Sequence, residues 1–153
     1  MLYGLALVVG IMAGLRAFSG VAAASWAARL GAAHIDDSWL AFMGYQWTPW
    51  IFTVLALVEF VTDQLPSTPS RKVPAQFGAR LVSGALSGAT IGTMGGSWIG
   101  GLLAGVIGAV IGTYGGAEAR ARLAQLFGRD LPAALIEDAV AIVLGVLVVS
   151  ALR

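Results

Sequence analysis

The feature that most constrains this chain is the stretch from Val73 to Ala117, which holds a single charged residue, Arg80. As one helix it would be roughly 65 Å long, about twice the thickness of the hydrocarbon layer of a membrane. The stretch therefore has to fold back on itself. Adjacent glycines interrupt a helix, so Met94-Gly95-Gly96-Ser97 predicts a turn between two helices.

Three further apolar stretches reach or approach the length of a membrane span: residues 2–30, 48–65 and 131–152. Over the whole chain only 11% of the residues are charged, whereas a soluble domain carries about a quarter. This composition excludes an ordinary soluble enzyme, a disordered chain and a nucleic-acid-binding protein. Without cysteine, the chain has no disulfide, thiolate metal site or cysteine nucleophile.

The sequence thus predicts an all-α fold, a polytopic membrane bundle that forms one integral membrane domain over residues 1–153. Five transmembrane helices are expected, at about 2–30, 48–65, 75–94, 97–117 and 132–152. The first is long, and a break at Arg16–Gly20 into two half-helices stays open. No Lys or Arg precedes the first apolar run, so we expect that run to be a retained span and not a cleaved signal peptide.

The charges in the loops orient this bundle. Two basic loops follow the second and fourth predicted helices, and they hold Arg71, Lys72, Arg120, Arg122 and Arg129. The loop at 31–47 has no Lys or Arg, and its single His34 is a poor metal site. Because positive loops stay in the cytoplasm, we expect an N-in, C-out protein of the bacterial cytoplasmic (inner) membrane.

Glycines recur every four residues in the third and fourth predicted helices, and the series includes Gly84, Gly88, Gly92, Gly108 and Gly112. Each glycine costs a helix about 1 kcal/mol relative to alanine, so a series in register needs a reason. Small residues at this spacing let a second helix approach closely in lipid. We therefore expect glycine-zipper packing, either at the centre of the bundle or at the seam of a homo-oligomer. Surfaces that slide during a conformational change are the alternative.

Charged residues inside the predicted spans are candidates for function, because each costs several kcal/mol in lipid. They are Arg16, Glu59, Asp63, Glu137 and Asp138. Glu59 and Asp63 lie one turn apart on the same helical face. Glu137 and Asp138 are adjacent, so we expect at most one of them to face the same centre. Arg16 is expected deeper, near the middle of the membrane.

Glu59 lies seven residues before Pro66, and Glu137 lies five residues after Pro132. Both glutamates are therefore expected at matching depth, roughly 8–10 Å inside the cytoplasmic boundary. Closely spaced carboxylates share protons, as a proton-coupled carrier requires. They could instead ligate a hard cation such as Mg²⁺, Na⁺ or Mn²⁺, with Glu59, Asp63 and Glu137 as ligands. Ion pairs with Arg16 that only fix the helices are the third possibility.

The loop after the second predicted helix also carries hydroxyl groups and cations. Ser70, Arg71 and Lys72 could hold a phosphate or a lipid head group. The alternative is a helix stopped by proline and followed by a positive-inside anchor.

Four segments together resemble a known family: Gly14–Phe18, Glu59–Arg71, Ala79–Ala85 and Leu135–Ala139. The family is an uncharacterised group of small bacterial membrane proteins catalogued as domain of unknown function 4126. The resemblance covers essentially the whole chain, and Glu59–Arg71 is its most specific part. It implies a bacterial integral membrane protein and no particular activity. A lysine often stands in the family where this chain has Gln64.

The leading interpretation is a small transporter, proton- or cation-coupled, with Glu59 and Glu137 as coupling carboxylates. In it Asp63 and Asp138 assist, and Arg16 is the counter-charge or an anion contact. The alternatives are a lipid-handling protein, either a flippase or a metal-dependent lipid-phosphate enzyme, and a structural or assembly protein. Expected partners are membrane lipids and further copies of the chain, as a dimer or trimer, with no nucleic acid. We expect no enzymatic activity, since no Ser–His–Asp set is present.

Overall fold

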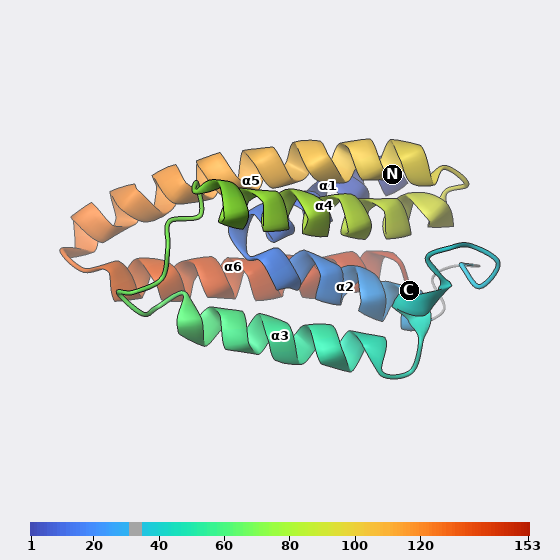
Figure 1. Cartoon of the computed structure of the whole chain (residues 1–153), viewed down its shortest axis with the longest axis horizontal. Coiled ribbons are helices and arrows are strands. Elements are labelled where there is room, and N and C mark those ends of the chain that lie inside the picture. Colours follow the sequence, from blue (N-terminus) through green and yellow to red (C-terminus); the bar gives the residue numbers. More distant parts are fainter. Residues whose placement is uncertain (31–34) are drawn as a thin grey trace.

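The computed structural model describes residues 1–30 and 35–153, and within them it consists of helices joined by turns and short loops (Figure 1). The helices are α1 Leu2–Leu15, α2 Ala17–Arg29, the short 3₁₀ helix η1 Ala41–Gly44, α3 Thr48–Thr62, α4 Pro74–Met94, α5 Trp98–Phe127 and α6 Asp130–Ala151. The all-α prediction is confirmed for this part of the chain. His34 lies outside the described residues.

The predicted first helix, residues 2–30, is wrong, because the structure divides it into α1 and α2. Arg16, between the two helices, has an extended backbone with φ −140° and ψ 117°. α2 then runs back along α1, so that the two form a helical hairpin with Arg16 at its tip (Figure 1). The two arms are in contact, since a methyl group on Gly20 would lie 3.0 Å from Ala13 Cβ.

Each helix after the hairpin runs opposite to the one before it, so the connections gather at two ends of the bundle (Figure 1). One end, called the basic end, carries the 63–73 loop and the turn between α5 and α6. The other, called the terminal end, carries both chain termini and the turn at 95–97. The N-in, C-out prediction required the termini at opposite ends and is wrong. The hairpin is the reason, because it returns the chain to the end where it started.

Local signals explain the boundaries of the remaining helices. Pro49 and Pro74 lie in the first turns of α3 and α4, where a missing N–H costs nothing. The turn predicted at 94–97 is confirmed, and Ser97 caps α5 by accepting a hydrogen bond from the Gly100 N–H at 3.3 Å. α5 ends at Phe127, and the residue after it, Gly128, has a φ of 67°, which favours glycine.

α5 extends ten residues beyond the end predicted for the fourth helix, from 117 to Phe127. The added turns contain good helix formers, and Glu118 and Arg122 form an i,i+4 ion pair of 2.7 Å on the exposed surface. Arg120 and Arg122 are therefore helical residues near the basic end and not loop residues.

The glycines of the series lie where α4 meets α5. A methyl group on Gly88 would lie 2.7 Å from Gly105 Cα, and one on Gly92 would lie 2.6 Å from Gly101 Cα. Gly84 is equally close to Gly105, with 2.7 Å between that methyl position and the carbonyl oxygen. The two backbones thus touch with no room for a side chain between them.

α1 packs on the neighbouring face of α5 in the same manner. Methyl groups on Gly108 and Gly112 would overlap the carbonyl oxygens of Leu7 and Ile11. These glycines therefore face helices of their own chain and are not available as the seam of an oligomer. The dimer or trimer stays a prediction.

The outer surface of the bundle is strongly apolar. Several aliphatic side chains of α3 and α6 are more than half exposed: Val54, Val58, Val61, Val143, Val146 and Leu147. Among the described residues, α5 and α6 are long and apolar enough to cross a membrane, and α1 and α3 are shorter apolar helices. So much exposed apolar surface is typical of contact with lipid or with another protein.

Candidate functional site

The tip of the hairpin exposes the N-terminus of α2, and a carboxylate from another helix caps it. Glu59 of α3 accepts hydrogen bonds from the backbone N–H of Ala17 at 2.6 Å and of Phe18 at 2.9 Å. These are two of the N–H groups that a helix leaves without a partner, and the negative charge complements the helix dipole. Glu59 therefore caps α2, although it lies far from that helix in the sequence.

The C-terminus of α1 is capped by a cation in the complementary way. Arg80 of α4, only 2% exposed, donates through Nη1 to the carbonyl oxygens of Gly14 at 3.0 Å and Leu15 at 2.8 Å. Its Nη2 lies 3.9 Å from Glu59 Oε1 and 3.7 Å from Asp63 Oδ2. Its buried Nε has no hydrogen-bond partner in the described part of the chain. Arg80 is thus held mainly by carbonyl groups and not by carboxylates.

Arg16 connects the tip to α3 and α6. It is fully buried, and its Nε donates to Asp138 Oδ1 at 2.7 Å while its Nη2 lies 2.6 Å from the same oxygen. Its Nη1 donates to Asp63 Oδ2, and its guanidinium lies 5.9 Å from the ring centre of Phe60. One buried cation therefore joins the buried carboxylate of Asp138 to the partly buried carboxylate of Asp63, and these three residues are called the Arg16 layer below.

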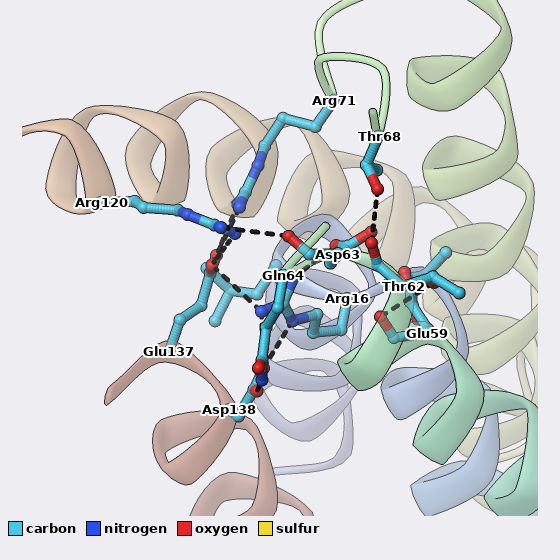
Figure 2. Close-up of polar contacts among 12 residues, drawn as sticks. Arg16, Glu59, Thr62, Asp63, Gln64, Thr68, Arg71, Arg120, Glu137 and Asp138 are labelled. Carbon is cyan, nitrogen blue, oxygen red and sulfur yellow. Dashed lines mark hydrogen bonds and ion pairs between the residues drawn. The ribbon is translucent and has the colours of Figure 1, made fainter. Parts of the chain in front are cut away.

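Three arginine side chains approach the carboxylate of Glu137 in α6 (Figure 2). Arg71 donates to it through Nη1 at 2.5 Å and through Nη2 at 2.9 Å, and Arg120 Nη1 lies 3.4 Å away. Arg16 Nη2 is 3.7 Å from the same carboxylate, which is 7% exposed. Three cations thus surround one carboxylate.

Arg120 also closes the basic end. Its Nε and Nη2 donate to the two carboxylate oxygens of Asp130 at 2.9 and 2.6 Å. Its Nη2 donates to the backbone carbonyl of Asp63 at 3.2 Å as well. α5 is thereby tied to both α6 and the end of α3.

The five charged residues singled out in the sequence lie together around the hairpin tip, as the matching depth of Glu59 and Glu137 indicated. Two details were wrong. Glu137 and Asp138 both face arginines, because the guanidinium of Arg16 lies close enough to reach both carboxylates. Arg16 lies in the layer of the carboxylates and not deeper, because the chain turns back there instead of continuing.

Other residues have changed roles. Among the described residues no group of three acidic or histidine side chains is arranged to hold a metal ion, so the cation ligands Glu59, Asp63 and Glu137 stay a prediction. Lys72 points to the ring of Tyr114, with its Nζ 5.8 Å from the ring centre. Sequence reasoning missed Arg80 as a site residue, although its isolation in a long uncharged stretch was a usable signal.

A polar pocket of about 390 Å³ lies at the basic end and is called the basic-end pocket. The side chains that line it include Asp63, Thr68, Ser70, Arg71, Arg80, Arg120 and Asp130. Ser70 and Arg71, predicted as phosphate contacts, thus border the same hollow as two arginines from α4 and α5.

A second cavity, of about 420 Å³, lies between α2, α3 and α6 and is called the apolar cavity. Its lining includes Ser19 and Ala22 of α2, Ala56 and Phe60 of α3, and Gly145 of α6. It also includes Leu57, which is 56% exposed, so the cavity reaches the apolar outer surface.

No known protein family, curated protein or solved structure matches this chain. The resemblance to the family of domain of unknown function 4126 therefore stays a prediction. Function is accordingly inferred from the geometry of the hairpin tip and its two neighbouring cavities.

Proposed function

We propose that the chain is a small proton-coupled membrane transporter in which the Arg16 layer separates two cavities. The observation that carries the proposal is their position along α3. Phe60 lines the apolar cavity and Asp63 lines the basic-end pocket, so the two hollows are one helical turn apart. Arg16 contacts both of these residues. The apolar cavity also extends to Leu30 and Ser150, near the terminal end, whereas the second pocket lies at the basic end. A carrier needs such a thin barrier between spaces that open to opposite sides.

In this proposal α4, α5 and α6 span the bacterial inner membrane, and α3, with 15 residues, crosses it together with the turns at its two ends. The α1–α2 hairpin enters the membrane from the terminal end. The basic end lies in the cytoplasm, by the positive-inside rule. The aromatic residues Trp39, Trp47 and Trp50, each more than half exposed, then lie near the outer interface. α1 has 14 residues, so the hairpin reaches roughly 21 Å into a hydrocarbon layer of about 30 Å.

Protons fit the site better than metal ions as the coupling species. Each of the buried carboxylates is already bonded to an arginine or to backbone N–H groups. A proton neutralises a carboxylate without needing a coordination sphere, and it releases the arginine that the carboxylate held. Protonation of Glu137 would release Arg71 and Arg120, both of which line the basic-end pocket. Glu59, in contrast, is assigned to capping α2 and not to coupling.

The absence of native cysteine allows a test that needs no knowledge of the substrate. Single cysteines are placed in the apolar cavity with Ala56→Cys and in the basic-end pocket with Ala117→Cys. A membrane-impermeant thiol reagent is then applied to vesicles of each orientation, with labelling normalised to denatured protein at the same pH. We expect Ala56→Cys to react from the outside and Ala117→Cys from the cytoplasmic side. Glu137→Gln, which removes the charge that holds Arg71 and Arg120, should change the two rates severalfold in opposite directions.

The matched control is Glu118→Gln. It removes an exposed carboxylate whose arginine partner among the described residues is Arg122, and it should leave both rates unchanged. Labelling of both cysteines from one side, or rates that are the same in Glu137→Gln and in the control, would contradict the proposal.

A lipid-handling protein is the second candidate, and the apolar cavity favours it. This cavity opens onto the exposed face of α3 through Leu57, so an acyl or isoprenoid chain could enter from the bilayer. The two candidates differ in the source of their ligand, and the experiment of the next subsection separates them.

A further inference from the structure

We infer that the basic-end pocket binds an anion bearing a phosphate group, which takes the place of Glu137 on Arg71 and Arg120. The inference names the substrate class of the proposed transporter and so rests on that proposed function. Arginine forks match the oxygen geometry of phosphate, and hydroxyl groups from Thr68 and Ser70 line the same pocket.

The first supporting observation is the incomplete pairing of Arg80. This side chain is 2% exposed, lines the pocket, and has an Nε without a hydrogen-bond partner among the described residues. Buried guanidinium groups normally have all their donors satisfied. Its Nη2 forms only long ion pairs, with Glu59 at 3.9 Å and Asp63 at 3.7 Å. Arg80 therefore lines the pocket with one donor unpartnered and with its two carboxylates at long range.

The second observation is the convergence of three arginines on Glu137. Arg71 lies at 2.5 Å, Arg120 at 3.4 Å and Arg16 at 3.7 Å from it. Arg120 and Arg16 also pair with aspartates, so Glu137 is above all the partner of Arg71. Arg71 also holds both carboxylate oxygens at once, the geometry in which arginine holds phosphate. Glu137 thus acts as an internal competitor for the positions of an incoming anion.

The acidic residues of the pocket are themselves paired with arginines. Asp63 and Asp130 also line it, and Asp63 is bonded to Arg16 while Asp130 is bonded to Arg120. The lining contains three arginines against these two aspartates, and Glu137 pairs with two of the three arginines. An anion in the pocket competes with Glu137 for them, so anion binding and loss of the Glu137 charge favour each other.

Binding of inorganic phosphate to the purified full-length protein is measured by isothermal titration calorimetry, with chloride as the reference anion. We expect Arg71→Gln to weaken binding at least tenfold and Ser70→Ala to weaken it severalfold. Glu137→Gln should instead strengthen binding severalfold, because it removes the internal competitor. Arg122→Gln, which removes a 77% exposed arginine of the same end, should change nothing. A purely structural cluster would not bind more tightly after loss of Glu137.

The source of the phosphate group is resolved in a second arm. Native mass spectrometry compares protein in nanodiscs of phosphatidylcholine alone with protein in nanodiscs that also contain phosphatidic acid. Retention of phosphatidic acid that depends on Arg71 and is displaced by inorganic phosphate assigns the site to a lipid head group. Calorimetric binding of inorganic phosphate without such retention assigns it to a free anion.

Absence of both kinds of binding, or equal binding by wild type and Arg71→Gln, would overturn the inference. That failure is separate from failure of the proposed function. If the cysteine labelling responds to Glu137→Gln and no phosphate binds, the transporter stands and its ligand is of another class. If phosphate binds and the labelling does not respond to Glu137→Gln, the anion site stands and coupled transport does not.

Discussion

The two sides of the bundle are packed in opposite ways. α1, α4 and α5 touch through glycine backbones, with no space left for a methyl group at Gly88 or Gly105. α2, α3 and α6 enclose a cavity of about 420 Å³ and are joined near it by the charged side chains of the Arg16 layer. Close backbone packing resists sliding, whereas ion pairs can be exchanged one partner at a time. For the proposed transporter the comparison predicts that the glycine-packed side is the fixed frame and that the other side moves.

The largest expected effect comes from breaking the Arg16 layer, which joins the hairpin tip to α3 and α6. Arg16→Gln leaves Asp63 and Asp138 buried without their cation, which should cost about 3–5 kcal/mol of folding stability. Thermal unfolding in detergent, followed by circular dichroism, measures the loss. Arg122→Gln is the control and should unfold like the wild type. An Arg16→Gln protein as stable as that control would show that the Arg16 layer does not hold the bundle together.

A smaller effect is expected from overfilling the glycine-packed side. In Gly105→Ala the new methyl group overlaps the carbonyl oxygen of Gly84, which should cost about 1–3 kcal/mol. Gly115→Ala is the matched control on the same helix, because nothing lies within 4 Å of its methyl position. The control should be neutral or stabilising by up to about 1 kcal/mol. Equal stability of the two variants would mean that the frame is not rigid.

Removal of the remote cap tests the hairpin itself. Glu59→Gln keeps one acceptor but loses the charge at the N-terminus of α2, and we expect a loss of about 1 kcal/mol. Proteolysis or amide exchange at Ala17 and Phe18 should increase in the same variant. Glu118→Gln, at an exposed position, should change neither quantity, and exchange that is equally fast in both variants would remove Glu59 from the capping role.

The smallest effect is expected inside the apolar cavity. Ala56→Val places two methyl groups in empty space and should change stability by no more than about 0.5 kcal/mol. The same change at Ala109, fully buried against Gly84 on the glycine-packed side, should cost about 1–3 kcal/mol. Chemical denaturation of the pair measures the difference between the two sides directly. Similar losses for both variants would indicate that the cavity closes in solution.

Much of the fold could be predicted, because its signals are local. The turn at 94–97 follows from adjacent glycines, and the later helices follow from apolar length and proline positions. The break at Arg16 could only be left open as an alternative, since neither a glycine with positive φ nor a proline stands there. Its stability comes from Glu59 and Arg80, more than 40 residues away in the chain. Only tertiary structure brings those charges to the two helix ends.

The candidate site was predictable to a similar degree. Counting residues from the prolines was enough to predict that Glu59 and Glu137 lie at a similar depth in the bundle, because helical rise is constant. The ion pairs among the charged residues were not predictable. Adjacent residues such as Glu137 and Asp138 can both contact one arginine when its side chain is long enough to reach both. Arg120 was assigned to a loop, because the helical continuation of α5 lies past the apolar stretch that defined it.

Hydrogen–deuterium exchange of the full-length protein in nanodiscs tests the central claim, that release of Glu137 loosens one side of the bundle and not the other. Glu137→Gln, which mimics the protonated carboxylate, is compared with wild type and with Glu118→Gln. We expect about tenfold faster exchange in the 63–73 loop and the first turns of α2 and α6, with α4 and α5 unchanged around the glycine contacts. Faster exchange that begins in α4 and α5, or that is uniform along the chain, would contradict the account.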